Sequence, residues 1–576
     1  MNFMFPVAEP ADPKGRYAAL SADKLRGGYY TPPRVAEWLC AWAIREKGDE
    51  VLEPSCGAGA FATAAARRLR ALKATAAASA RQLTAVELVE AEAAKARDGL
   101  AESLGKAASK AVVEGDFFAW WDNREGEAFD AVVGNPPFIR YQSFPEPARS
   151  RAMAMMERLG FKPNRLTNIW VPFVVAAAEA LRPGGRLAMV IPAELLQVTY
   201  AAQLRSYLTA KFRHIDIVAC NELFFEGAEQ EVVLLMADGA LPERLPNNVC
   251  RVAVTEVATV GDLLVSEPTD LLSRSEEKDV RGDKEKWLKY FLSGREIGLL
   301  RELREHGRVV PLGTLADVDV GIVTGANAFF VLRRSEIEQR RLKKFARRLV
   351  SRSAHLRGAS LSNEDWVALE AGDERVTLLD IRAGVAGLTP GSAAAAYVAQ
   401  GEADDVHRGY KCSIRKPWFH VPAIWSPDAF LFRQIHDFPR LVLNGANATA
   451  TDTIHRVRAR AVDAAVLVAG SYTHLTAASA EIEGRSYGGG VLELEPTEAE
   501  RLLVPDAQAL AAALPLAECD KLVRAGKLND VLAENDRLIL RDAMGLSEGD
   551  VATLKGAWDR MRGRRFSRGK AARAKA

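Results

Sequence analysis

Helical and strand patterns alternate from about residue 36 to residue 236, and this alternation restricts the fold more than any other feature. Apolar residues recur at helical spacing in VAEWLCAWAI and AFATAAARRLRAL. The stretch VPFVVAAAEALRPGG is predicted to be a helix that stops at its Pro-Gly-Gly. Strand-like stretches are DEVLEPS, LTAVEL, FDAVVGN, RLAMVIPAE, HIDIVAC and EQEVVLLMA. Strands separated by helices predict a doubly wound, mostly parallel α/β sheet covered by helices on both faces.

Changes in composition divide the rest of the chain. We expect a first domain over 1–245, a connecting helical segment over 246–308, a mixed α+β domain over 309–505 and a helical segment over 506–576. The chain ends in MRGRRFSRGKAARAKA, which has seven Lys or Arg after Met561 and too few apolar residues to fold alone. We therefore expect a disordered basic arm, which either adds phosphate contacts or only improves solubility.

Composition excludes several classes of protein. The 576 residues include 77 Lys or Arg against 75 Asp or Glu, so the formal net charge is only +2. Any surface for nucleic acid must therefore come from local basic clusters. The six cysteines form no CxxC pair and the eight histidines show no metal-ligand spacing, so neither a disulfide framework nor a metal site is expected. No apolar run could span a bilayer and no secretory signal is visible at the start, which favours a cytoplasmic protein without a membrane partner.

A glycine-rich turn joins a predicted strand to a predicted helix in VLEPSCGAGAF. Gly57 and Gly59 let the backbone approach a ligand closely, and the helix N-terminus attracts a carboxylate or phosphate. Tight strand–helix turns also need glycine, so this loop alone does not distinguish a cofactor site from a structural turn. The third glycine of the dinucleotide fingerprint is missing, with Ala62 or its neighbours in its place, which argues against NAD.

Two acidic residues follow the next two predicted strands. Glu87 lies where a carboxylate can accept hydrogen bonds from both hydroxyls of a ribose. Asp116, in AVVEGDFFAWW, suits the amino group of an adenine, and Phe117 offers a stacking face. An acid at a helix N-terminus is also common for structural reasons. Because the carboxyl ends of parallel strands meet at one edge of a sheet, the loop and the two acids together predict a nucleoside pocket.

The strand in FDAVVGN ends in a rigid corner, GNPPF, over residues 134–138. The side-chain oxygen of Asn135 and the carbonyl oxygen of Pro136 can both accept hydrogen bonds from one planar amino group. Such an amine is a poor nucleophile because its lone pair is delocalised into a ring, and holding both hydrogens frees that lone pair. The prolines keep reorganisation small, and Phe138 offers a stacking face worth about 1–3 kcal/mol for a nucleobase. The corner therefore predicts a site that activates an aromatic amine or an amide.

The order of these motifs resembles that of gamma-class DNA adenine-N6 methyltransferases, most closely the single-chain, Taq-type members of restriction–modification systems. The resemblance covers roughly the first 240 residues and rests on GGYYTPPRVAEWL, EPSCGAGAF, GNPPF, TNIWVPFVVAAAEALRPGGRLAMVIP and ELFFEGAEQEVVLLM. The segments GIVTGANAFFVL, RKPWFHVP and EGRSYGGGVLELEP look, less specifically, like the family's target-recognition region. The resemblance implies a class I S-adenosylmethionine-dependent methyltransferase fold followed by a mixed α+β target-recognition domain. It also implies methyl transfer from S-adenosylmethionine to N6 of an adenine flipped out of duplex DNA.

Carried over to this chain, the resemblance gives roles to individual residues. Those implied to bind S-adenosylmethionine are Tyr30, Thr31, Glu53, Ser55, Gly57, Gly59, Glu87, Asp116, Phe117 and Asn135. Asn135, Pro136 and Phe138 are implied to be catalytic. The family places a second aromatic ring against the target base, and here Phe224 is the better match, with Phe225 as its alternative. Phe138 replaces the tyrosine that the family has more often, and the stacking face survives.

Two basic groups are candidates for DNA contacts. One follows the corner directly and consists of Arg149, Arg151, Arg158, Lys162 and Arg165. The other lies in the second half, in segments punctuated by glycine or proline, and consists of Arg415, Lys416, Arg485 and Tyr487. A solvated helix face explains the first group equally well, and a structural role in the fold explains Tyr487 equally well.

Several other functions share part of the pattern. A methyltransferase acting on cytosine N4, on a glutamine amide or on a guanine of ribosomal RNA must also activate a nitrogen whose lone pair is delocalised, so the same corner would serve it. A cytosine-C5 enzyme needs a Pro-Cys nucleophile, whereas Cys56 follows serine. A DNA-binding subunit without activity does not explain an intact cofactor pocket, and no nuclease cluster of carboxylates and lysine is visible. We expect a monomeric, stand-alone methyltransferase that acts on double-stranded DNA and functions beside a separate restriction endonuclease.

Overall fold

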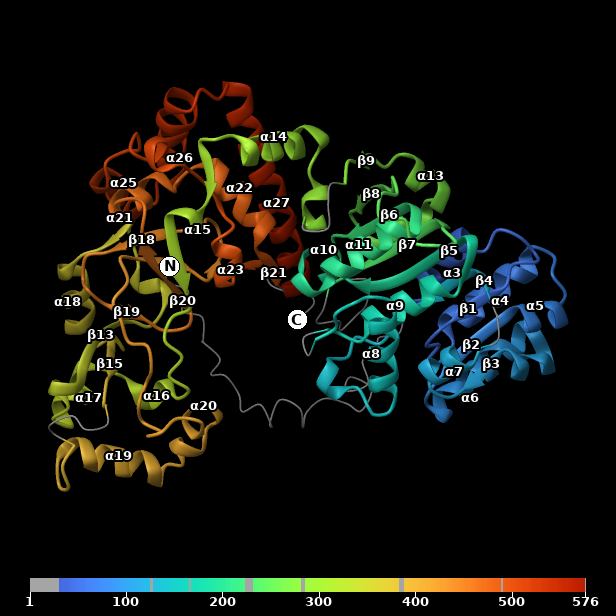
Figure 1. Cartoon of the computed structure of the whole chain (residues 1–576), viewed down its shortest axis with the longest axis horizontal. Coiled ribbons are helices and arrows are strands. Elements are labelled where there is room, and N and C mark those ends of the chain that lie inside the picture. The colour runs from blue at the N-terminus through green and yellow to red at the C-terminus, as the bar shows by residue number, and fades with distance from the viewer. Residues whose placement is uncertain are drawn as a thin grey trace. The chain divides into compact units, whose positions relative to one another are not determined.

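The computed structural model describes residues 31–124, 128–164, 167–222, 231–280, 285–382, 388–487 and 490–574 (Figure 1). The chain forms two compact units; the second covers Leu292–Gly569, and the chain end from Lys570 groups with the first. The expected connecting segment over 246–308 is thus divided between both units. No helix in the described part of the chain is both long and apolar enough to cross a membrane.

One large sheet forms the centre of the first unit. Within the described residues it has nine strands in the order β3-β2-β1-β4-β5-β7-β6-β8-β9. The strands are β1 (Val51–Glu53), β2 (Leu83–Glu87), β3 (Val112–Glu114), β4 (Phe129–Gly134), β5 (Leu181–Pro192), β6 (Phe212–Cys220), β7 (Val232–Ala240), β8 (Arg251–Val257) and β9 (Glu277–Lys278). The pairs from β3 through β5 are parallel, whereas β7 runs antiparallel between β5 and β6. The expected mostly parallel sheet is therefore confirmed.

The strand order reverses between β1 and β4. The chain places β2 and β3 on one side of β1, then crosses to start β4 on the other side. In open α/β sheets the crevice outside the carboxyl ends of the strands at such a point receives the ligand. The topology therefore indicates the end of β1, β2, β3 and β4 as the place to look for a site.

Helices cover both faces of this sheet. They are α3 (Pro33–Ala43), α4 (Ala60–Ala71), α5 (Ala76–Gln82), α6 (Glu90–Leu104), α7 (Phe117–Asn123), α8 (Ala148–Arg158), α9 (Trp170–Glu179), α10 (Glu194–Gln197), α11 (Ala202–Lys211), α12 (Val260–Val265) and α13 (Pro268–Ser273). Alternate strand residues, such as Ala131 and Val133, belong to one apolar cluster with α3, α4 and α6. Val132 faces the other way and is also fully buried, so that face is covered as well.

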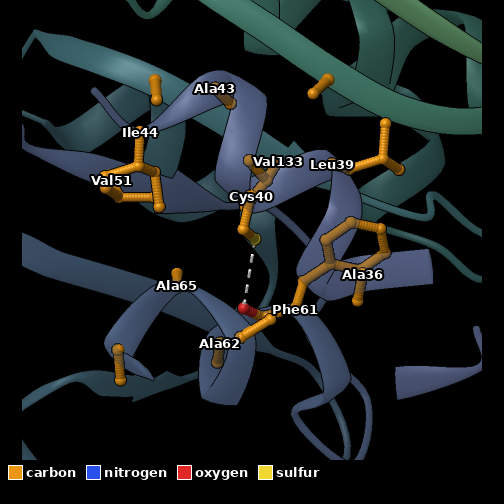
Figure 2. Packing of buried hydrophobic residues seen from close by; sticks show 14 of the residues in the cluster. Ala36, Leu39, Cys40, Ala43, Ile44, Val51, Phe61, Ala62, Ala65 and Val133 are labelled. Atoms are coloured by element: carbon orange, nitrogen blue, oxygen red, sulfur yellow. Dashed lines mark hydrogen bonds between the residues drawn. The ribbon is translucent and has the colours of Figure 1, made fainter. Parts of the chain in front are cut away.

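The contact between α3 and α4 shows how closely this cluster packs (Figure 2). Cys40 of α3 is fully buried, and its thiol donates a hydrogen bond to the carbonyl oxygen of Phe61 in α4. Ala62 and Ala65 present only methyl groups beside Ile44 and Val51, so the helices can approach each other and β1. This packing supports the first turn of α4, which follows the glycine-rich loop.

One helix end differs from the expectation. The helix α9 ends at Glu179, before the Pro-Gly-Gly, and these residues belong to β5 instead. The pairing of β4 with β5 jumps from Phe129↔Leu181 to Ala131↔Arg186, so residues 182–185 form a bulge. Gly184 adopts a φ of +83° there, which glycine accepts without strain.

The second unit has smaller sheets and more helices, as expected for a mixed α+β domain. Its strands are β10 (Val309–Pro311), β11 (Ala316–Asp319), β12 (Val331–Leu332), β13 (Ala346–Val350), β14 (Ser360–Leu361), β15 (Thr377–Leu379), β16 (Ala429–Phe432), β17 (Gln434–Ile435), β18 (Leu441–Asn444), β19 (Thr449–Ala450), β20 (Ile454–Ala459), β21 (Arg485–Tyr487), β22 (Val491–Glu493) and β23 (Leu503–Pro505). Among the described residues, five of them form the largest sheet of this unit, in the order β11-β20-β16-β18-β14.

The helices of this unit lie before, between and after those strands. They are α14 (Gly294–Glu305), α15 (Leu312–Leu315), α16 (Asn327–Phe330), α17 (Arg334–Gln339), α18 (Asn363–Ala371), α19 (Ala393–Ala403), α20 (Tyr410–Ser413), α21 (Ala464–Gly470), α22 (His474–Glu483), α23 (Pro496–Ala499), α24 (Ala507–Leu510), α25 (Leu516–Arg524), α26 (Leu528–Asn535) and α27 (Glu548–Ala574). A π-helix over Asp536–Ala543 continues α26.

The basic end of the chain is part of a long helix. Residues after Met561 continue α27, and the side chains of Met561 and Arg565 are buried. The guanidinium of Arg565 forms hydrogen bonds of 3.0 and 2.6 Å with the buried carboxylate of Glu481 in α22. The expectation of a disordered arm is therefore wrong for these residues, because a long-range ion pair supplies the stabilisation that their few apolar side chains do not.

Candidate active site

A cavity of about 270 Å³ lies at the carboxyl ends of β1 to β4. Eight of the residues predicted from the sequence line it, namely Thr31, Glu53, Ser55, Gly57, Glu87, Asp116, Phe117 and Asn135. Pro137 of the corner and Ile139 just after it line the cavity too. A larger concavity of about 1480 Å³ in the same unit includes Lys211 and Arg251, which lie at the amino ends of β6 and β8 and carry none of the motifs. The smaller cavity is therefore the candidate site.

The glycine-rich loop has the backbone conformation that its glycines predict. Gly57 and Gly59 adopt φ angles of +51° and +87°, and Gly59 precedes the first turn of α4. A Cβ atom on Gly59 would lie 2.9 Å from both Cα and Cβ of Ala96 in α6. The absence of a side chain at Gly59 therefore lets α6 pack directly on the loop.

Glu87 ties this loop to the neighbouring strand. Its Oε2 accepts a 2.8 Å hydrogen bond from the backbone N–H of Gly57, and its Oε1 accepts one of 2.8 Å from Val89. Each carboxylate oxygen has a second lone pair, so Glu87 keeps the capacity to accept from a ligand hydroxyl. Leu88, next in the chain, is 53% exposed and lines the cavity, where it can contact a flat ring. Sequence analysis missed Leu88, although an apolar residue directly after a predicted ribose ligand was a usable signal.

Glu53 is the most deeply buried acid of the site. Its side chain is only 1% exposed, and its Oε2 has no hydrogen-bond partner among the described residues. Burial raises the pKa of Glu53 well above its ordinary value, and the negative charge of Glu87 raises it further. A positively charged or N–H-donating ligand would relieve both effects.

The charged side chains that line the cavity, among the described residues, are all acidic. Its acidic lining residues are Glu53, Glu87, Glu92 and Asp116, and no lysine, arginine or histidine is among the described residues that line it. Such a wall disfavours the phosphates of a dinucleotide or nucleoside triphosphate. It favours an uncharged nucleoside that carries positive charge elsewhere.

Asp116 begins the helix α7 and meets a basic residue from α8. Its Oδ1 caps the helix by accepting from the backbone N–H of Phe118 at 3.1 Å. Its Oδ2 forms a 2.8 Å ion pair with Arg151. The ring of Phe117 is buried and stacks on Phe173, with centroids 5.2 Å apart, so it forms part of the cavity wall.

The corner at the end of β4 is connected to the other walls of the cavity. The side-chain amide of Asn135 donates to the hydroxyl of Thr31 at 3.3 Å, which orients its oxygen. The hydroxyl of Ser55, next to the glycine-rich loop, donates to the backbone carbonyl of Asn135 at 3.4 Å. Pro136 is buried, and Phe138 is half-buried against the apolar cluster of the sheet. The structure thus brings the corner and the predicted cofactor loop to one place.

Three predicted residues lie outside the described part of the chain, namely Tyr30, Arg165 and Phe224. Phe225 and the side chain of Tyr487 lie outside it as well. Their positions stay predictions.

The arginines proposed for DNA contacts mostly have partners within the protein. Arg149 and Arg158 form ion pairs of 2.7 Å with Glu146 and Asp122. Arg485 pairs with Glu498 at 2.9 Å. Arg415 donates to backbone carbonyls, whereas Lys162 and Lys416 are exposed.

Comparison with known proteins assigns both parts of the chain to one group. Residues 62–225 match the Eco57I restriction-modification methylase family, and residues 284–540 match the C-terminal domain of the Type II methyltransferase M.Eco57I. The Type II methyltransferase M.AccI of Acinetobacter calcoaceticus is 21% identical over 491 residues, which are 83% of this chain and 85% of that protein. M.TthHB8I of Thermus thermophilus is 28% identical over 242 residues, 41% of this chain and 49% of that protein.

A solved structure resembles nearly the whole chain in fold. It is the Type IIL restriction-modification enzyme MmeI in complex with DNA, with a TM-score of 0.54 and 13% sequence identity over 92% of this chain and 75% of that one. The two family matches and the relatives along both halves lead to one conclusion. Over residues 62–225 and 284–540, this chain is similar to the Eco57I-type methyltransferases of Type II restriction–modification systems.

Proposed function

We propose that this protein transfers a methyl group from S-adenosylmethionine to the N6 amino group of an adenine in duplex DNA, as gamma-class enzymes do. The observation that carries the proposal is the Asn135-Pro136 corner beside a cavity whose charged lining residues are acids. The corner supplies acceptors for an amine, and the cavity suits a nucleoside with a cationic side group. We further propose that the modification protects DNA from a separate endonuclease.

The cavity fits S-adenosylmethionine better than the other common nucleoside cofactors. S-adenosylmethionine carries a sulfonium and an ammonium group but no phosphate, and when bound it supplies an electrophilic methyl group with a good leaving group. Glu53, with its unpaired buried oxygen, suits a positively charged or N–H-donating part of that molecule. Glu87 suits the ribose, and Asp116 with Leu88 suits the adenine ring and its amino group.

The corner residues act on the target amine. The side-chain oxygen of Asn135 and the backbone carbonyl of Pro136 accept its two hydrogens, which localises the lone pair on nitrogen. The Asn135 acceptor is held before the substrate arrives, because Thr31 accepts from its side-chain amide and Ser55 donates to the backbone carbonyl of the same residue. Fixed acceptors need little reorganisation during the reaction, which is the main source of rate enhancement at such sites. As the nitrogen–methyl bond forms, the bond from that methyl group to sulfur breaks and a neutral thioether leaves. The methylated nitrogen then loses one proton to solvent, which restores a neutral amine.

An adenine in a duplex cannot reach this corner while it is stacked. The base must leave the helix at a cost of a few kcal/mol, which a stacking face such as Phe138 partly offsets. Cytosine N4 presents the same kind of amine, and the corner chemistry would serve both bases. The choice of adenine therefore rests on the family resemblance of the motifs and needs a direct test.

The test is methylation of duplex DNA by the purified protein with S-adenosylmethionine, followed by sequencing that detects modified bases. We expect N6-methyladenine at one sequence context, and no modification with Asn135→Ala. N4-methylcytosine would correct the target base and leave the corner mechanism intact. Methylation of a glutamine-containing protein or of ribosomal RNA in place of DNA would refute the proposal.

A further inference from the structure

In the second unit, one surface combines exposed apolar side chains with exposed cations. Tyr410 and Ile414, one helical turn apart at α20, are 74% and 62% exposed. Val320, in the turn after β11, is 36% exposed. We call the exposed side chains of Arg408, Tyr410, Lys411, Ile414 and Lys416 the α20 surface. Large apolar side chains in water indicate a binding partner when they occur together.

Two arginines hold this surface in a fixed position. Arg415 donates hydrogen bonds of 2.7 and 2.6 Å to the carbonyl oxygens of Thr324 and Val323. Arg456 is buried and donates to the carbonyl of Val320 at 3.2 and 3.0 Å. Both guanidinium groups thus bind the backbone of one turn, residues 320–324, and one of them attaches that turn to α20.

Close backbone packing adds to this rigidity. A Cβ atom on Gly325 would lie 2.5 Å from Cβ of Lys411, so the turn lies directly against α20. Cys412, between Lys411 and Ser413, is fully buried. The α20 surface is therefore a rigid projection, and its apolar side chains are exposed because the fold places them there rather than because the segment is loosely held.

The charge around the apolar pair indicates the kind of partner. Residues 406–427 include four Lys or Arg and contain no Asp or Glu. Arg415 is used to attach the turn and Arg408 forms a 3.1 Å ion pair with Asp405, which directly precedes this segment, whereas Lys411 and Lys416 are exposed. An apolar centre with cations around it is complementary to bases flanked by phosphates, whereas an acidic protein partner would not require exposed rings.

We propose that the α20 surface enters duplex DNA, with Tyr410 and Ile414 against the bases and Lys411 and Lys416 on phosphates. This inference rests on the proposed function and adds to it the part of the second unit that contacts the sequence. Arg415 is then a positioning residue and not a DNA contact.

The test compares two variants of the full chain with matched controls. Tyr410→Ala with Ile414→Ala should weaken binding to the methylated sequence by at least about tenfold, with little change in the salt dependence. Lys411→Gln with Lys416→Gln should weaken binding to all sequences and reduce the slope of log affinity against log salt by about 1.8. The controls are Val367→Ala, at an exposed apolar residue of α18, and Lys521→Gln, at an exposed lysine of α25. Neither control should change binding.

Binding of S-adenosylmethionine and the hydrogen-exchange protection of the second unit should stay at the parent values in every variant, because all the substituted side chains are exposed. Parental DNA binding and methylation by the Tyr410/Ile414 variant would overturn the inference and leave the proposed function standing. If the parent protein itself neither binds nor methylates duplex DNA, the proposed function is wrong and this inference falls with it.

Discussion

Replacing Gly59 by alanine would test whether the cofactor loop depends on the direct contact between that loop and α6. The matched control is Gly57→Ala, the same substitution two residues earlier in the same loop. Both glycines have positive φ angles, but only Gly59 has a neighbour that an added Cβ atom would meet, at 2.9 Å on Ala96. At Gly57 no atom of the described residues, apart from its own chain neighbours, lies within 4 Å of such a Cβ atom. The difference between the variants therefore isolates the contact from the backbone strain.

The expected loss in the free energy of unfolding is the sum of the backbone strain and the steric contact. A left-handed backbone costs an L-residue about 1–2 kcal/mol, which applies to both positions. Overpacking against rigid atoms costs a further ~1–3 kcal/mol, and the atoms met at Gly59 include the Cα of Ala96, which cannot turn aside. We expect Gly57→Ala to lower the free energy of unfolding by about 1–2 kcal/mol and Gly59→Ala by about 2–5 kcal/mol.

A protein of two units does not unfold in one step, so a single melting temperature would mix both. Native-state hydrogen exchange of peptides from α4 and α6 measures the first unit alone. The expected result is a larger loss of protection in Gly59→Ala than in Gly57→Ala, with peptides of the second unit unchanged. Equal losses in both variants would show that α6 moves away freely, and the reasoning about the contact would be refuted.

Three further predictions concern the site and the second unit. Asn135→Ala should keep cofactor binding but slow single-turnover methylation by about a hundredfold or more. Asn135→Asp keeps an acceptor and should retain some activity. A parental rate in Asn135→Ala would contradict the corner mechanism. Arg151→Met should raise the dissociation constant of S-adenosylmethionine by less than about tenfold, because it removes a partly exposed ion pair with Asp116. It should leave the salt slope of DNA binding unchanged; a reduced slope would mean that Arg151 binds a phosphate. Burial lowers the pKa of His355 to about 4, below its usual 6.5. Since the unfolded chain binds the proton more tightly than the folded chain, the second unit should lose stability as the pH falls from about 6.5 to 4. Urea unfolding of His355→Gln should lack this loss.

The pattern of hydrophobic residues was sufficient to predict the strands from β1 to β7, because strands that are buried on both faces form nearly continuous apolar runs. The site was predictable for a related reason. Glu53 and Glu87 end β1 and β2, and Asp116 and Asn135 follow β3 and β4. Because parallel strands end at one edge of a sheet, the topology alone brings these residues together.

Features that depend on distant partners were not predictable in this way. The ion pair of Arg151 with Asp116 joins residues that no local pattern connects, so Arg151 looked like one of several surface arginines. The bulge over 182–185 arises from the pairing of β5 with β4, whereas the isolated Pro-Gly-Gly looked like a helix end. Burial of Arg565 required knowledge of Glu481, 84 residues earlier in the chain.

The pair of Arg565 with Glu481 also affects the order in which the protein can form during synthesis. The strands of the large sheet are complete once residue 278 has been made, so the first unit can fold while the ribosome is still at work. The second unit cannot finish in the same way. Until residue 565 has emerged, the carboxylate of Glu481 would be buried without its counter-charge, which costs several kcal/mol. The nascent second unit should therefore stay incomplete, and open to chaperones, until nearly all of α27 has left the ribosome.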